Sequence, residues 1–112
     1  MKATDIIYKA KSATTGEWVQ GNYINSFSPG IIHNKSFQGN WSAINPETLC
    51  IGFKDEAGKL WFAGDKVVDL FNKDNGVIHF YIDGFFVSFK YAQNKKLSDC
   101  RHHLTVIGNI YD

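Results

Sequence analysis

The sequence predicts a small all-β domain, built mainly from antiparallel strands in a strongly bent sheet or barrel. Aromatic side chains make up 15% of the 112 residues, and these residue types favour pleated strands over helices. Short apolar runs alternate with turn sequences at close spacing, and no long stretch shows the apolar period of a helix. The length corresponds to one domain, residues 1–112, with its own core.

Residues 5–11 and 17–24 are the first two predicted strands, joined by a turn at 12–16. In the second strand Gly21 interrupts the alternation, which indicates a bulge or the close approach of another backbone. The following stretch, residues 25–45, is rich in Ser, Gly and Asn. We expect a loop with one short strand there.

The stretch 46–68 has the most regular pattern in the chain. Within it, residues 48–54 and 59–63 are expected to form the two arms of a hairpin over a turn at 55–58. Gly58 can take the left-handed conformation that such a turn needs.

Gly64 and Asp65 end that hairpin and begin the next strand, predicted over 66–71. Gly64 permits the unusual dihedral angles of a turn, and Asp65 can accept hydrogen bonds from the backbone of the preceding turn. A structural role is therefore expected for both residues. Residues 72–76 are a turn by composition.

Residues 77–90 form the best-defined predicted hairpin, with Asp83-Gly84 as its two-residue turn. The pairs that follow from this turn are Ile82 with Phe85, Phe80 with Val87, and Ile78 with Phe89. The face that carries these six side chains is predicted to be core. The other face carries Val77, His79, Tyr81, Phe86, Ser88 and Lys90. Residues 91–101 are expected to be a loop with room for one helical turn, and 103–111 the last strand.

The composition excludes a strong global electrostatic field, since the formal net charge is +1. Any binding to nucleic acid or acidic lipid would therefore need a local patch. No apolar run has the length of a signal peptide or a membrane span, so we expect a cytosolic protein without a membrane partner. In a reducing compartment Cys50 and Cys100 are expected to act as small hydrophobic residues.

No catalytic constellation or cofactor fingerprint is visible, so the sequence predicts neither an enzyme nor a cofactor. Cys100, His102 and His103 are metal-binding residue types, but adjacent strand histidines point to opposite faces and the spacing lacks the usual reach of metal ligands. A Cys-His nucleophile pair has no mark in the sequence either. The aspartates lie in turns and at strand starts, where carboxylates accept backbone N–H bonds.

The favoured functional hypothesis is a protein-interaction or self-assembly module. Three tryptophans are many for so small a core, and Tyr81 with Phe86 would leave an aromatic patch on the second face of the hairpin. The partner would be a second copy of the chain, giving a homo-oligomer, or another protein. The candidate surface consists of Tyr81, Phe86, His79, Lys90, Lys95, Lys96 and Arg101.

The alternative is a nucleic-acid-binding module that uses the basic segment 90–103. Lysine, arginine and histidine side chains there could contact phosphates, and nearby aromatic rings could stack on bases. The residues concerned are Lys90, Lys95, Lys96, Arg101, His102 and His103, with Tyr81, Phe86 and Tyr91. The near-neutral net charge, and the frequent occurrence of lysine runs in solvated loops, weigh against this alternative.

Five segments occur in a distinctive order along the chain. They are Pro46-Glu47-Thr48, Gly52-Phe53-Lys54-Asp55, Gly58-Lys59, Gly64-Asp65-Lys66-Val67 and Val106-Ile107-Gly108-Asn109-Ile110-Tyr111. In this order and spacing they resemble the YopX family of phage and prophage proteins, and the resemblance spans most of the chain. The isoleucine that usually follows Gly-Asp in that family is Lys66 here.

The resemblance implies a mostly β domain of SH3-like barrel type, encoded by phages or integrated elements and acting in the cytoplasm of a bacterial cell. Its partner there would be itself or a host or phage protein. It brings no catalytic residue, because the matching positions are turn and core types. These positions are Pro46, Glu47, Thr48, Gly52, Asp55, Gly58, Gly64, Asp65, Gly108 and Asn109. Gly-Asp-X-Val also begins a barrel strand in SH3-like toxin ribonucleases, so RNA cleavage or another small-hydrolase activity is a second alternative.

Overall fold

The structure is a computed structural model that describes residues 6–24, 31–34, 40–81 and 84–112. Side chains are described for residues 6–21, 43–81 and 84–112. The side chain of Trp41, one of the three tryptophans, lies outside the described side chains, and the expectations for the pair of Ile82 with Phe85 and for Asp83 fall outside the described residues.

The described strands pair antiparallel in two open sheets, accompanied by one short α-helix. The predicted all-β, mainly antiparallel class is therefore confirmed, in the form of small sheets rather than a closed barrel. The chain falls into two compact units, residues 1–61 and 62–112. No helix in the described part of the chain is long and apolar enough to cross a membrane.

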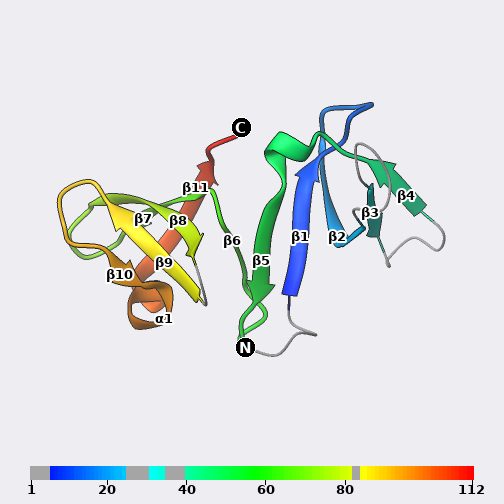
Figure 1. The fold of residues 1–112 in the computed structure, drawn as a ribbon. Coiled ribbons are helices and arrows are strands. Elements are labelled where there is room, and N and C mark those ends of the chain that lie inside the picture. Colours follow the sequence, from blue (N-terminus) through cyan, green and yellow to red (C-terminus); the bar gives the residue numbers. More distant parts are fainter. Residues whose placement is uncertain (1–5, 25–30, 35–39, 82–83) are drawn as a thin grey trace. The chain divides into compact units, whose positions relative to one another are not determined.

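The first sheet contains six strands in the order β4-β3-β2-β1-β5-β6 (Figure 1). These strands are β1 (Ile6–Lys11), β2 (Trp18–Ile24), β3 (Ile31–Asn34), β4 (Asn40–Ala43), β5 (Cys50–Lys54) and β6 (Leu60–Phe62). The expectation of one short strand within residues 25–45 is wrong, because β3 and β4 pair with each other there. The small polar residues of this stretch predicted a loop, so the composition did not indicate the second strand.

The segment Pro46–Thr48 is a 3-10 turn, η2, so the predicted start of a strand at Thr48 is two residues early. Asn45 caps this turn by accepting a hydrogen bond from the backbone N–H of Glu47. The Thr48 hydroxyl donates to the Asn45 carbonyl at 2.7 Å and accepts from the Lys11 backbone N–H at 2.8 Å. These bonds hold Thr48 in a turn beside β1 instead of in a strand.

The turn predicted at 55–58 is confirmed. Asp55 Oδ1 accepts the backbone N–H groups of Ala57 and Lys59, both at 2.9 Å, and Oδ2 accepts the indole N–H of Trp61 at 2.9 Å. Gly58 has a φ of +84°, a left-handed conformation that a side chain would strain. The turn is thus fixed by one carboxylate and one glycine.

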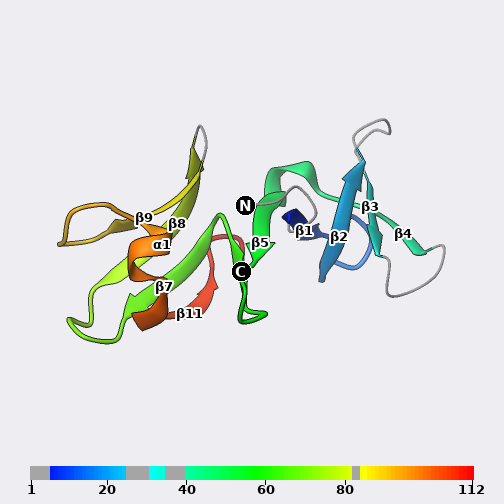
Figure 2. The same ribbon diagram turned by 90° about the horizontal axis from the view of Figure 1, so that it is seen from below.

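The second sheet has five strands in the order β10-β9-β8-β7-β11 (Figures 1 and 2). These are β7 (Asp65–Asp69), β8 (Asn75–Tyr81), β9 (Gly84–Phe89), β10 (Lys95–Lys96) and β11 (Leu104–Asn109). The helix α1 (Leu97–Cys100) and the 3-10 turn η3 (Arg101–His103) lie between β10 and β11. The predicted strand at 66–71 ends at Asp69, whose carboxylate turns the chain by accepting the N–H groups of Phe71 and Asn72.

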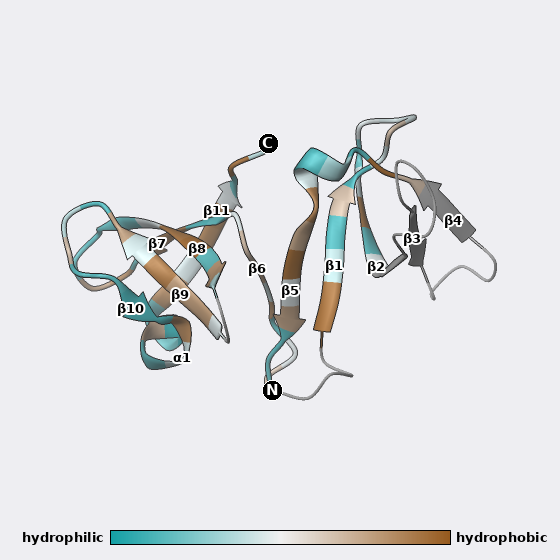
Figure 3. Ribbon diagram, in the orientation of Figure 1, coloured by the Kyte–Doolittle hydropathy of each residue, from teal (hydrophilic) through white to brown (hydrophobic). Residues whose placement is uncertain are grey.

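The core of the second unit lies on one side of this sheet, here called the inner face. Val67, Ile78 and Val87 are fully buried there, and α1 adds Leu97 and Cys100. On the face predicted as core, Ile78, Val87 and Phe89 are buried, but Phe80 is 38% exposed, so its predicted core position is wrong. Figure 3 shows the hydropathy of these strands. The predicted register is wrong by two residues, because Phe80 pairs with Phe85 and Ile78 with Val87.

Candidate binding face

The opposite side of the second sheet, here called the outer face, gathers side chains from five strands. Strand alternation places a residue on the outer face at every second position, and the cross-strand pairs fix which positions these are. The outer-face residues are Lys66, Val68, Asn75, Val77, His79, Tyr81, Phe86, Ser88, Lys96, Thr105 and Ile107. The described strands place neither Asp nor Glu on this face.

Three rings form an aromatic cluster at one end of the outer face. His79 and Phe86 are a cross-strand pair, and their ring centroids lie 5.4 Å apart at an interplanar angle of 27°. Tyr81 meets Phe86 edge to face at 6.5 Å. Lys96 on β10 pairs with Phe86 from the other side. Lys96 is therefore a strand neighbour of the rings His79, Phe86 and Tyr81, here called the aromatic cluster, of which His79 and Tyr81 are exposed and Phe86 is half-buried.

A hollow of about 370 Å³ lies next to the aromatic cluster on the same face. Its lining combines apolar residues with two lysines, and consists of Lys66, Val67, Asn75, Gly76, Val77, Ser88, Phe89, Lys90 and Ile107. Ile107 reaches it from a β-bulge in β11, where the register shifts between Val106 and Gly108. At the far end the Lys90 ammonium lies 5.2 Å from the centroid of the Tyr91 ring.

The acidic side chains of the second unit are largely used by the fold. Residues 62–112 carry six basic side chains against six aspartates, yet Asp65, Asp69 and Asp74 are 2%, 2% and 7% exposed. Each accepts backbone N–H groups, as Asp74 does from Tyr91 and Ala92. All five lysines of this unit are exposed. Its surface is therefore more basic than the balanced sequence indicates.

The predicted interaction residues are only partly brought together. Tyr81, His79, Phe86 and Lys96 share the outer face, and Lys90 lies at its end. Lys95 faces the other way because it neighbours Lys96 in a strand, and its ammonium lies 5.9 Å from the Phe89 ring centroid. Arg101 belongs to η3, which contacts the inner-face residue Asp69 through His103.

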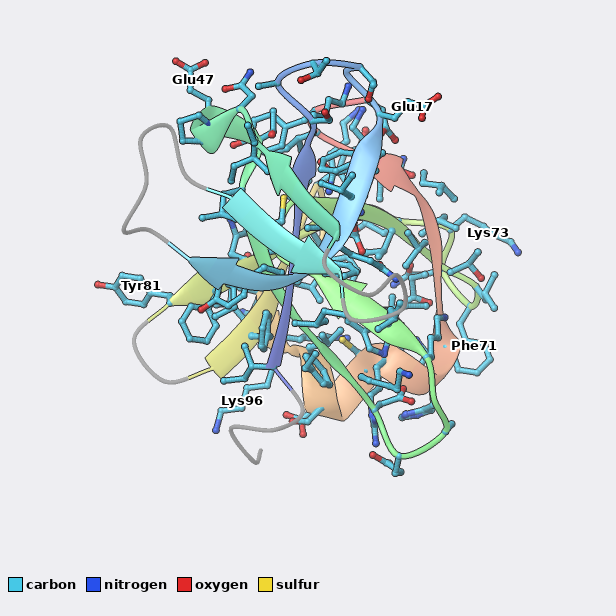
Figure 4. The ribbon with its side chains drawn as sticks, turned by 90° about the vertical axis from the view of Figure 1, so that its right-hand side faces the viewer. Glu17, Glu47, Phe71, Lys73, Tyr81 and Lys96 are labelled. Atoms are coloured by element: carbon cyan, nitrogen blue, oxygen red, sulfur yellow. The ribbon has the colours of Figure 1, made fainter. Side chains whose placement is uncertain are left out.

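Sequence reasoning missed Lys66 and Ile107 as outer-face residues, whereas Ser88 was predicted on the second face of the hairpin and lies there. Lys66 was treated as a departure from a motif, but the alternation of β7 from the buried Asp65 could have placed it outward. Figure 4 shows Tyr81 and Lys96 projecting on one side of the second unit, with Phe71 and Lys73 on the opposite side.

Cys100, His103 and Asp69 are the described residues closest to a catalytic pattern. Asp69 Oδ2 lies 3.3 Å from His103 Nδ1, and the His103 ring stacks on Phe71 at 4.9 Å. Burial raises the pKa of the Cys100 thiol, and nearby Asp69 adds to this rise. The Sγ donates to the Lys96 carbonyl at 3.4 Å. This environment favours the neutral thiol, the opposite of what a nucleophilic cysteine needs.

Asp69 in the same cluster has a lowered pKa. Burial alone would raise the pKa of Asp69, but the N–H donors of Phe71 and Asn72 and the nearby His103 outweigh it, so the pKa lies below its ordinary value. Asp69 is thus held as a carboxylate that accepts bonds from its own turn. In the described residues, no group of three or more His, Cys, Asp and Glu side chains is placed to hold a metal ion.

The motif residues from the sequence all lie at turns or in the interior. Gly64, with φ +93°, donates its N–H to Ile78 and accepts from Ile110. Asp65 accepts from the side chain of Asn109 and from the backbone of Phe62. Asp65 and Asn109 are thus interior residues, and Gly108 is the strand partner of Lys66.

The fold and these motifs define a small antiparallel β protein of two sheets. A Gly-Asp turn leads into the first strand of the second sheet, and its last strand ends at Gly108-Asn109. A family model described as YopX protein matches residues 7–112. The chain therefore belongs to the YopX family, and the match includes both units. No curated protein and no solved structure matches the chain.

Proposed function

We propose that this protein is a non-catalytic binding domain, encoded by a phage or prophage and acting in the bacterial cytoplasm, and that the outer face is its binding surface. The aromatic cluster carries this proposal. Tyr81 is 66% exposed and His79 is also exposed, although a solvent-facing sheet surface is usually polar. Exposed apolar groups gathered in one place commonly mark an interaction site.

The environments of the candidate chemical groups support a non-catalytic role. Cys100 is 1% exposed and its thiol has a raised pKa. The carboxylate oxygens of Asp65 and Asp69 accept hydrogen bonds from backbone and buried side-chain donors. A catalytic site would instead direct such groups into an accessible cavity. The lining of the hollow contains lysines, a serine and an asparagine but no acid.

A capture experiment tests the proposal. Immobilised wild-type protein is exposed to bacterial lysate, and bound protein and nucleic acid are both quantified. We expect the double variant Tyr81→Ser, Phe86→Ser to lose most of the captured material. The control Phe71→Ser, whose ring is 80% exposed but lies off the outer face, should retain it. Equal capture by wild type and the double variant would overturn the proposal.

Self-association is the second candidate, favoured by a separate ring pair. Phe80 and Phe85 are cross-strand partners with centroids 4.9 Å apart, on the inner side of the hairpin, and Phe80 is 38% exposed. A second copy could cover these rings. Light scattering should then show a mass that rises with concentration and falls for Phe80→Ser; a monomer mass at every concentration would exclude this candidate.

A further inference from the structure

We propose that the partner of the outer face is single-stranded nucleic acid, whose bases stack on the aromatic cluster while its phosphates contact Lys96, Lys66 and Lys90. The inference rests on the proposed function, because it uses the same face. It adds the chemical class of the partner.

The charge pattern of the outer face is the first reason. Lys66 and Lys96 lie on the described strands of this face and Lys90 at the end of β9. The described strands place no acid on the face, although the carboxylate of Asp112 lies against Gly108, the strand partner of Lys66. The near-neutral sequence argued against nucleic acid, but three of the aspartates that produce this balance are buried. A local lysine surface is what phosphate contacts require.

The exposed rings are the second reason. Tyr81 projects into solvent from β8 (Figure 4), and Phe86 is half-buried between His79 and Lys96. Proteins that bind single strands combine such stacking platforms with cationic grooves, since every base has a π-face. Lys96, the strand partner of Phe86, and Lys90, beside the Tyr91 ring, could hold a phosphate next to a stacked base.

The layout along β9 is the third reason. Phe86 and Ser88 lie on one side of β9, and Lys90 follows directly after the strand. The backbone from Phe86 to Lys90 spans about 14 Å at roughly 3.4 Å per residue. The aromatic cluster with Lys96 begins this track, and Lys90 with Tyr91 ends it. The hollow between them offers the Ser88 hydroxyl and the Asn75 amide. An extended strand could therefore find rings and cations at both ends and hydrogen-bonding groups between.

Other anionic partners match fewer of these features. A duplex keeps its bases stacked on each other, so it could use the lysines but not the rings. An acidic peptide would also pair with the lysines, but its carboxylates provide no planar groups for the three rings. Single strands alone use both parts of the face.

The test measures fluorescence anisotropy with labelled oligothymidylate and oligouridylate of about twelve nucleotides, a length within the roughly 4–16 nucleotides that one OB fold covers. We expect binding to weaken roughly 5- to 100-fold in Phe86→Ser and in Tyr81→Ser, the usual loss for one stacking ring. Phe71→Ser should bind as wild type does. Urea unfolding of each variant shows that the fold is retained.

Neighbouring lysines provide a matched pair for the electrostatic part. Lys96→Gln should reduce the slope of log K against log salt by about 0.7, the value for one lost phosphate contact on a single strand. Lys95→Gln removes the same charge one residue away, on the other side of the sheet, and should leave the slope unchanged. Lys73→Gln, on the opposite side of the unit, is a second control.

The outcomes separate this inference from the proposed function. Equal binding of duplex and single strand, or equal slopes for the two lysine variants, would overturn the inference. Binding to polyglutamate but not to oligonucleotides would also overturn the inference. In that case, lysate capture that still depends on Tyr81 and Phe86 would continue to support the outer face as the binding surface. If neither oligonucleotide binding nor capture responds to outer-face substitutions, both proposals fail.

Discussion

Asn109 donates its side-chain N–H to Asp65 Oδ1 at 3.0 Å, across 44 residues of chain. Both side chains are 2% exposed, and they are cross-strand partners at the start of β7 and the end of β11. Asp65 Oδ2 accepts the Phe62 N–H at 3.1 Å, and Asn109 Oδ1 accepts the Tyr111 N–H at 3.0 Å. The pair thus ties the Gly-Asp turn to the end of the chain, which gives both motifs one structural purpose.

The first prediction removes this bond. Asn109→Ala leaves a buried carboxylate without one of its donors, so the free energy of unfolding should fall by about 2–3 kcal/mol. Asn109→Asp should cost more at neutral pH, because it brings two carboxylates together in the interior. Chemical denaturation at pH 7 measures both values.

The exchanged pair is the control for this prediction. Asp65→Asn combined with Asn109→Asp restores one amide and one carboxylate in reversed positions, and should recover part of the stability lost by Asn109→Asp alone. Additive losses in the double variant would show that the two side chains do not act as a pair.

The second prediction concerns pH and Asp69. Its pKa lies below the ordinary value, despite burial, because of the N–H donors of Phe71 and Asn72 and the nearby His103. The lowered pKa stabilises the fold above the ordinary carboxyl pKa of about 3.9, and this contribution is lost as pH falls through the folded-state value. Asp69→Asn should therefore be less stable than wild type at pH 7, with the difference shrinking below about pH 3.9. A gap in urea midpoints that stays constant to acid pH would contradict this.

The hairpin of β8 and β9 shows what the sequence could and could not determine. The alternation of apolar side chains depends only on parity, so a register error of two residues leaves every face correct. Ile78 and Val87 were accordingly predicted as core, and they are fully buried. The register itself depends on turn geometry, and the Asp83-Gly84 signal placed the turn one residue too late, because Tyr81 pairs with Gly84.

The candidate face was predictable only in part for a related reason. Tyr81, His79 and Phe86 follow from alternation within one hairpin. Lys66 joins them through pairing between β7 and β8. Lys95 and Lys96 face opposite sides of the sheet because they form the two-residue strand β10, in a segment whose composition predicted a loop. Contacts between strands that are distant in sequence carry no local signal, so the lysines could be listed but not sorted by face.

The third prediction concerns the close packing at Gly76. A Cβ added there would lie 2.7 Å from Val87 Cγ1 and 3.1 Å from Phe89 Cδ1, so Gly76→Ala should cost about 1–3 kcal/mol by overpacking the inner face. Gly58 is the contrasting case, with open space around its Cβ position and a φ of +84°. Gly58→Asn should cost little, since Asn tolerates the left-handed region. Thermal unfolding of the two variants makes the comparison, and a neutral Gly76→Ala would count against the inner packing.

The fourth prediction tests the state of Cys100. Burial raises the pKa of its thiol, with Lys95 acting in the opposite direction, and the side chain is 1% exposed. In a Cys50→Ala background, where Cys100 is the only thiol, Ellman's reagent at pH 8 should react no faster than the protein unfolds. Urea-unfolded protein should react at once, which controls for the reagent. Reaction of the native protein well above its unfolding rate would instead reveal an accessible thiolate at Cys100, and would reopen a Cys-His nucleophile as a function of this domain.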